Sequence, residues 1–122
     1  MKKILIIDDD VTFQKTMSDV FENFGYKVVE AHDGEEGLLL VDKELPNLVI
    51  LDLVMPKLGG MDFLKILQKD GGSKIPVLII SNFSGDDKVS QGIEYGVRGY
   101  IVKSDESVKT IANVVESIIG KV

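Results

Sequence analysis

Apolar and polar residues follow two different periods along the chain, and each period predicts one kind of element. Short, nearly unbroken apolar runs at 3–8, 47–53 and 76–81 predict buried strands of a sheet. Two further strands are predicted at 27–31 and 99–103. Between them, apolar residues recur at helical spacing, which predicts helices at 13–24, 34–45, 61–69, 86–96 and 105–120. Strand and helix therefore alternate along the whole chain.

The first helix carries a continuous apolar stripe from Phe13 through Met17 and Phe21 to Phe24. These positions share one face of a helix, so we interpret the stripe, Phe13 included, as core. Gly25 follows directly and suits the C-terminal cap.

Alternating strands and helices imply right-handed βαβ units, a parallel sheet and helices on both faces of it. The 122 residues match the usual size of a single domain, and no linker, low-complexity tract or internal repeat divides them. We predict one α/β domain over residues 1–122, a doubly wound five-stranded parallel sheet with five helices.

Composition narrows the possible partners. The formal net charge of −6 and the single arginine argue against direct binding of nucleic acid, which requires clustered basic residues. The chain has no cysteine, which excludes disulfides and thiolate metal sites. No apolar run reaches the roughly 18 residues of a membrane helix, and the run near the N-terminus ends at Asp8, too early for a signal peptide. We expect a cytoplasmic protein that does not insert into membranes.

Polar residues stand at the carboxyl ends of four of the five predicted strands. These are Asp8 and Asp9 after the first strand, Asp52 in the third, Ser81 in the fourth and Lys103 in the fifth. In an open parallel sheet, functional groups gather at the carboxyl ends of the strands, so we expect these side chains to lie together. Three carboxylates against one ammonium leave negative charge for a cation, and oxygen ligands suit Mg²⁺ or Mn²⁺. A lysine and such a cation beside a carboxylate can also handle a phosphoryl group.

Each residue alone also has a structural explanation. Asp8 or Asp9 can cap a helix, Asp52 can begin a turn, Ser81 can be structural, and Lys103 can be a solvated strand end. Their joint occurrence at four strand ends favours a shared site.

Two nearby polar residues are better explained without that site. We interpret Asp10 as a helix cap or an acid of the first helical turn, outside the acid pair that precedes it. His32, the only histidine, is interpreted as a loop residue without an evident partner.

Over essentially its full length the chain resembles the receiver domain of response regulators of two-component signalling systems. The resemblance lies in the acid pair Asp8-Asp9, in LDLVMPKLGGMDFL (51–64) with its Asp-x-x-Met-Pro-x-x-x-Gly pattern, in IIS ending at Ser81, and in YIVK (100–103). No single piece is specific, but their order and spacing together are. The resemblance implies a CheY-like, flavodoxin-like fold with strand order 2-1-3-4-5.

The resemblance also implies a phosphotransfer site. Asp52 would be the phosphoacceptor, taking its phosphoryl group from a histidine kinase or a phosphotransfer protein. Asp9, Asp52 and the backbone carbonyl of Val54 would bind Mg²⁺, with Mn²⁺ as an alternative, and Asp8 would act through water. Lys103 would pair with the phosphoryl oxygens. The protein would catalyse only its own phosphorylation and dephosphorylation and would not be an enzyme for other substrates.

The remaining implied roles concern signalling. Ser81 would hydrogen-bond the phosphoryl group, and Tyr100 would turn inward as Ser81 moves. The predicted fourth helix, fifth strand and fifth helix would carry the changed surface to a downstream protein target. If the chain is complete, it would be a stand-alone receiver; if it is a piece of a longer protein, an output domain would lie elsewhere, and the sequence leaves both open.

Two positions depart from the family's pattern. Asn82 stands where a small residue usually follows the switch serine, and its amide would either crowd the phosphoryl group or hydrogen-bond it. Ser104 stands where proline usually follows the lysine. The sequence leaves the isomer of the Lys103–Ser104 peptide open, although the cost of about 2.5–4 kcal/mol for a cis bond without proline favours trans.

Two other functions remain as alternatives. Asp8-x-Asp10-x-Thr12 matches the start of haloacid-dehalogenase-type phosphatases, in which Asp8 would be the nucleophile, but Asp52 would then be unexplained. A receiver-like interaction module that never takes a phosphoryl group is the second alternative. A flavin carrier is excluded, since no glycine-rich, hydroxyl-rich phosphate loop follows the first strand.

Overall fold

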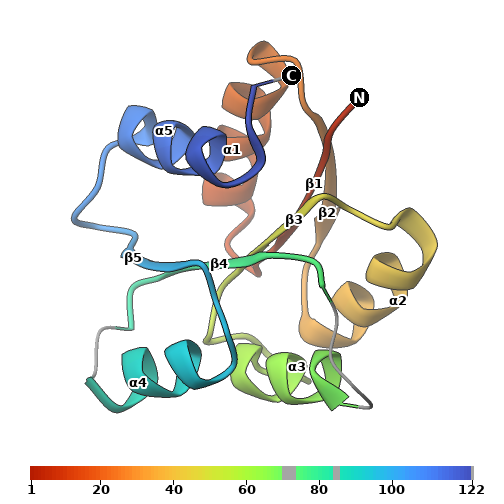
Figure 1. Ribbon diagram of the computed structural model, residues 1–122, viewed down its shortest axis with the longest axis vertical. Coiled ribbons are helices and arrows are strands. Elements are labelled where there is room, and N and C mark those ends of the chain that lie inside the picture. The colour runs from red at the N-terminus through yellow and green to blue at the C-terminus, as the bar shows by residue number, and fades with distance from the viewer. Residues whose placement is uncertain (70–73, 84–85, 122) are drawn as a thin grey trace.

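The computed structural model describes residues 1–69, 74–83 and 86–121, with side chains for all of these except 86–89. Strands and helices alternate over this part of the chain as the pattern predicts (Figure 1). Their bounds are β1 Lys3–Ile7, α1 Val11–Asn23, β2 Lys27–Ala31, α2 Gly34–Glu44, β3 Leu48–Leu51, α3 Gly60–Leu67, β4 Val77–Ser81, α4 Asp86–Glu94, β5 Gly99–Val102 and α5 Val108–Ile119.

The last helix begins later than its apolar pattern predicts. Asp105 forms a turn, in which its N–H donates to the Val102 carbonyl, instead of opening the helix. The N-cap of α5 is Ser107, whose hydroxyl accepts from the Thr110 N–H at 3.1 Å. A serine cap satisfies a helix N–H that would otherwise lack a partner, and the prediction of a start at 105 was therefore wrong.

All strand pairings are parallel, in the order β2-β1-β3-β4-β5. This confirms the predicted doubly wound sheet. Helices α1 and α5 lie on one side of the sheet, and α2, α3 and α4 lie on the other (Figure 1). Both faces are covered, which explains why the central strands read as unbroken apolar runs.

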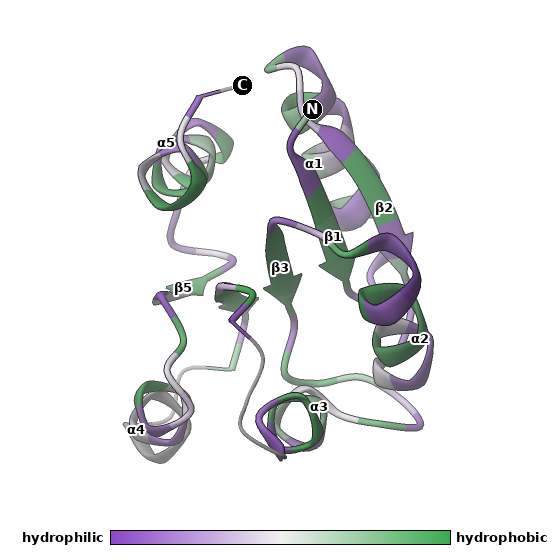
Figure 2. Ribbon diagram, turned by 45° about the vertical axis from the view of Figure 1, so that its right-hand side comes forward, coloured by the Kyte–Doolittle hydropathy of each residue, from purple (hydrophilic) through white to green (hydrophobic). Residues whose placement is uncertain are grey.

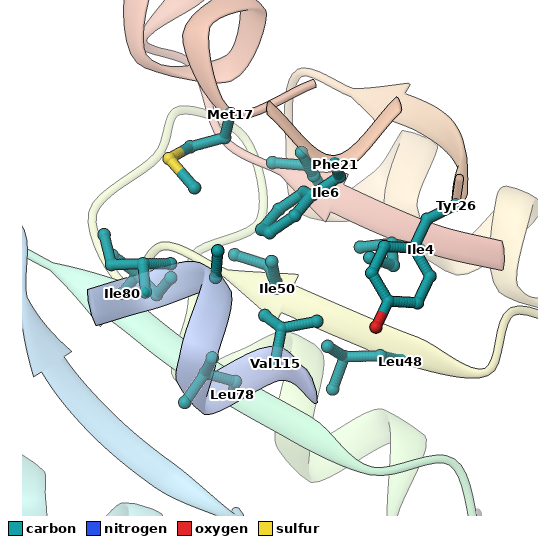
Figure 3. Close-up of a cluster of buried hydrophobic side chains, with 12 residues drawn as sticks. Ile4, Ile6, Met17, Phe21, Tyr26, Leu48, Ile50, Leu78, Ile80 and Val115 are labelled. Carbon is teal, nitrogen blue, oxygen red and sulfur yellow. The ribbon is translucent and has the colours of Figure 1, made fainter. Parts of the chain in front are cut away.

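Alternate residues of each strand divide the core into two layers. Ile4, Ile6, Leu48 and Ile50 face α1 and α5, where they meet Phe21, as Figure 3 shows. The intervening strand residues pack against α2 and α3 in the second layer. Figure 2 shows that β1 and β3, which lie between the helices, are hydrophobic over most of their length. Among the described residues, no helix combines the length and apolar character needed to cross a bilayer.

A close approach of backbones brings the start of α3 under the end of β3. A Cβ added to Gly60 would lie 2.4 Å from the Asp52 carbonyl oxygen and 2.7 Å from the Leu53 Cα atom. Real side chains cannot occupy that space without moving the backbone. Gly60 therefore allows the chain after β3 to fold back directly beneath Asp52.

Candidate functional site

Three carboxylates meet at the carboxyl ends of β1 and β3. One oxygen from each of Asp8, Asp9 and Asp52 lies within 4.8 Å of the others. Asp8 is 1% exposed and Asp52 is 6% exposed, whereas Asp9 faces solvent. They converge because β1 and β3 are neighbours in register, with Ile7 opposite Leu51. The structure thus brings together the acids that the sequence places at these strand ends.

Lys103 enters this cluster from the far edge of the sheet. Its N–H donates to the Ser81 carbonyl at 3.0 Å, which continues the pairing of β5 with β4 by one residue. The ammonium Nζ lies 2.8 Å from Asp8 Oδ2 and 3.4 Å from Asp52 Oδ2, and the side chain is 10% exposed. Burial lowers the pKa of Lys103, but pairing with Asp8 and Asp52 outweighs it and raises the pKa above its ordinary value.

Asp8 is the most perturbed acid of the cluster. Burial raises its pKa from 3.8 to about 6, against the opposing effects of Lys103 and of the Asp10 N–H, which donates to Oδ1 at 2.8 Å. Oδ2 makes the close ion pair with Lys103, but the contact lacks the angles of a hydrogen bond, and Oδ2 has no hydrogen-bond partner among the described residues.

This donor set fits a hard divalent cation. It consists of carboxylate oxygens, carries more negative charge than one ammonium can balance, and includes a buried oxygen without a hydrogen bond. Mg²⁺ and Mn²⁺ prefer such oxygen ligands. Asp8, Asp9 and Asp52 are therefore suited to hold one of these ions.

The hydroxyl groups predicted to act as switches both contact Phe83. Ser81 is buried, and its Oγ accepts from the Phe83 N–H at 3.2 Å. The Tyr100 hydroxyl donates to the Phe83 carbonyl. Burial, and after it the charge of Asp52, raises the pKa of Tyr100. Ser81 and Tyr100 thus bond to the backbone N–H and to the backbone carbonyl of the same residue, Phe83.

Val54, predicted to offer its carbonyl to a metal, lies two residues after the central carboxylate. Its N–H donates to Asp52 Oδ1 at 3.4 Å. Val54 itself is 61% exposed.

The two departures from the family's pattern contact each other. Asn82 Oδ1 accepts from the Ser104 N–H at 3.1 Å. Every peptide bond in the described part of the chain is trans, and this includes the Lys103–Ser104 bond. A proline at 104 would have no N–H to donate. Asn82 and Ser104 follow neighbouring strands, so the sequence could have indicated that they lie close together. Considering each position separately missed this pairing.

Two polar residues lie outside the cluster. Asp10 is the N-cap of α1 and accepts from the Phe13 N–H at 3.1 Å, which confirms the predicted cap. His32 is exposed after β2, but the expectation that it has no partner was wrong. Its Nδ1 lies 3.2 Å from Glu36 Oε1, four residues further on, a spacing that the sequence could have indicated.

Sequence reasoning also missed a contact of Phe13. The ring packs against the core as expected, yet it also faces the site, with Lys103 Nζ 4.5 Å from the ring centroid. No local pattern reports this contact, since ninety positions separate the two residues.

A comparison with protein families decides which family the chain belongs to. The model of the response regulator receiver domain matches residues 4–115. The chain belongs to this family. The resemblance to two-component receivers rests partly on the acids and the lysine that meet at the strand ends, and partly on Ser81 at the end of β4. The family match also decides against membership in the phosphatase family that Asp8-x-Asp10-x-Thr12 suggested.

Individual relatives agree with this assignment. The chain is 35% identical to Protein PilH of Pseudomonas aeruginosa over 104 residues, 84% of this chain and 86% of PilH. It is 37% identical to an uncharacterized transcriptional regulatory protein, YcbL of Bacillus subtilis, over 93% of this chain and 50% of YcbL. The chain spans half or less of YcbL and of the ycf27 regulators that it matches.

Solved receiver structures superimpose closely. Chemotaxis protein CheY4 of Vibrio cholerae gives a TM-score of 0.87 at 26% identity, over 97% of this chain and 98% of CheY4. The receiver domain of the Francisella response regulator 1452 gives 0.88 at 28% identity, over 98% of this chain and 97% of that domain.

Proposed function

We propose that residues 1–122 form a phosphorylation-dependent switch that accepts a phosphoryl group on Asp52. The observation that carries this proposal is the environment of Asp52, a buried carboxylate with an ammonium 3.4 Å from Oδ2 and two further acids beside it. A histidine kinase or a phosphotransfer protein would supply the phosphoryl group, as membership in the receiver family implies.

The transfer is an in-line displacement at phosphorus. An oxygen of Asp52 forms the new P–O bond while the P–N bond of the donor phosphohistidine breaks, and the imidazole leaves with the electron pair. Lys103 Nζ, already beside Asp52, balances charge on the phosphoryl oxygens. The product is an acyl phosphate on Asp52, which water later hydrolyses.

The acid cluster would bind Mg²⁺ or Mn²⁺ during this reaction. Asp9, Asp52 and the Val54 carbonyl would be direct ligands, and Asp8 would contribute through water. When bound, the ion supplies positive charge to the phosphoryl oxygens.

Phosphorylation would then change the segment after β4. The charge at Asp52 goes from −1 to about −2, with new strong acceptor oxygens. Ser81 would turn its hydroxyl from the Phe83 N–H towards the phosphoryl group, and Tyr100 would leave the Phe83 carbonyl and turn inward. Both existing bonds to Phe83 support this proposal, because the two switch residues share one backbone segment.

The signal would leave through the surface of α4, β5 and α5. Tyr100 lies on β5, which is part of this surface, and the α4 residue Ile93 is 69% exposed. We propose that a downstream protein binds this surface in the cytoplasm. Direct binding of nucleic acid by this domain is not expected from its charge of −6.

Incubation with Mg²⁺ and acetyl phosphate tests the proposal. We expect wild-type protein to gain the mass of one phosphoryl group in a base-labile adduct, and peptide mapping should place it on Asp52. Asp52→Ala should remain unlabelled. Asp10→Ala is the matched control, since it removes a neighbouring acid that only caps α1, and it should be labelled like wild type.

Other outcomes would favour the alternatives. Label that persists in Asp52→Ala and disappears in Asp8→Ala would identify Asp8 as the nucleophile. Absence of label from wild type, with acetyl phosphate and with histidine kinases alike, would support an interaction module that takes no phosphoryl group.

A further inference from the structure

The Lys103 ammonium lies between two different kinds of partner. On one side are carboxylate oxygens of Asp8 at 2.8 Å and Asp52 at 3.4 Å. On another is the ring of Phe13, whose centroid is 4.5 Å from Nζ. An ammonium within about 6 Å of a ring centroid is attracted by the negative face of the aromatic quadrupole. Lys103 therefore makes a cation–π contact as well as ion pairs.

The position of Phe13 is fixed before any phosphoryl group arrives. Its N–H donates to the N-cap Asp10, which anchors it in the first turn of α1. Its side chain is half-buried and packs against the core cluster beneath α1 and α5. The ring is thus a rigid surface against which the flexible lysine chain can rest.

An aromatic ring attracts the ammonium without neutralising its charge, whereas a carboxylate neutralises it. Loss of water around the buried ammonium is partly compensated by the ring, yet the ring has no net charge, so the full positive charge stays available to a phosphoryl group. A third carboxylate at this place would hold Lys103 away from Asp52. An aliphatic side chain would fill the space without attracting the charge.

We propose that Phe13 is a positioning residue for phosphoryl transfer, whose ring holds the Lys103 ammonium beside Asp52. This inference rests on the proposed phosphorylation of Asp52. Phe13 touches neither the phosphoryl group nor Asp52 in this role and acts through Lys103. The stripe therefore packs in the core at Met17 and Phe21 and also contributes to the site at Phe13. Phe24, at its other end, is 46% exposed, so the prediction that this residue is core was wrong.

Fluorination of the ring separates attraction from packing. Replacement of Phe13 with phenylalanines carrying one, three and five fluorines keeps nearly the same shape but progressively weakens the negative face. We expect the rate of phosphorylation by acetyl phosphate at saturating Mg²⁺ to fall stepwise, by about threefold to tenfold at the end of the series. Phe13→Leu should fall by a similar factor. Phe24→Leu, on the exposed end of α1, is the matched control and should react like wild type.

Nuclear magnetic resonance detects the contact between Phe13 and Lys103 in the unphosphorylated protein. Protons on a carbon that lies over an aromatic ring resonate upfield, so the Lys103 Hε protons of wild type should move downfield in Phe13→Leu and stay in place in Phe24→Leu. Equal rates across the fluorinated series, or no change of the Lys103 shift in Phe13→Leu, would overturn the inference. If wild type takes no phosphoryl group at all, the proposed function fails and the positioning role with it, while the Lys103 shift still decides whether the contact exists.

Discussion

We expect the metal-free protein to lose stability as the pH rises, because the carboxyl group of Asp8 is buried. Burial raises the pKa of Asp8 from 3.8 to about 6, so between these values the folded protein binds a proton that the unfolded chain has released. Stability falls with pH wherever the folded state binds more protons. The contribution of Asp8 is therefore fully present below pH 3.8 and is lost as the pH rises through about 6.

The size of this loss follows from the difference in pKa. One pKa unit corresponds to about 1.36 kcal/mol, so the charged form of Asp8 costs about 3 kcal/mol relative to the unfolded chain. A little under half of it, on the order of 1 kcal/mol, falls between pH 5 and pH 8. Bound Mg²⁺ should remove most of this dependence, because a cation favours the charged carboxylate.

Urea unfolding followed by far-UV circular dichroism measures the effect. Wild type and Asp8→Asn are compared at several pH values from 5 to 8, with a chelator and then with Mg²⁺. Groups that titrate in both proteins cancel in the difference. We expect wild type to lose on the order of 1 kcal/mol relative to Asp8→Asn over this range without Mg²⁺. Parallel pH profiles of the two metal-free proteins, or equal stabilisation of both by Mg²⁺, would refute the reasoning.

Three further changes probe the surroundings of the site. Gly60→Ala forces a Cβ to within 2.4 Å of the Asp52 carbonyl oxygen, so urea unfolding should show a loss of about 2–3 kcal/mol, with slower phosphorylation. Asn82→Ala removes the acceptor of the Ser104 N–H, which should lower stability by about 0.5–1 kcal/mol and speed hydrogen exchange of that amide. Asp10→Ala removes the N-cap of α1 and should cost about 1 kcal/mol in thermal or urea unfolding.

Each of these predictions has an outcome that would contradict it. Gly59→Ser adds a side chain where the nearest obstacle is 3.5 Å away and supplies an N-cap for α3, so it should be neutral or stabilising; a loss equal to that of Gly60→Ala would contradict the steric argument. In a Ser104→Pro background, Asn82→Ala should cost nothing more, and additive losses would argue against their pairing. An Asp10→Ala protein as stable as wild type would show that the cap contributes little.

The sequence by itself determined the layout of the fold. Apolar runs that are buried on both faces can only be central strands of a covered sheet, and stripes such as that of α1 can only be helices packed on it. Once the strands are parallel and joined by right-handed crossovers, their carboxyl ends share one edge. For that reason Asp8, Asp52, Ser81 and Lys103 could be grouped without coordinates. Local caps such as Asp10 were equally predictable, since they depend on residues only a few positions apart.

Only the tertiary structure decided how these groups pair. Lys103 lies closer to Asp8 than to Asp52, and this order depends on burial and on side-chain geometry that no spacing encodes. The Asn82–Ser104 bond and the ring of Phe13 beneath Lys103 likewise join segments that only the completed sheet and its packed helices bring together. Periodicity reports which face of an element is apolar, but contacts between distant elements are set by the packing of the whole domain. The sequence pattern therefore predicts Phe13 as a core residue, and only the folded structure shows that it also contacts Lys103.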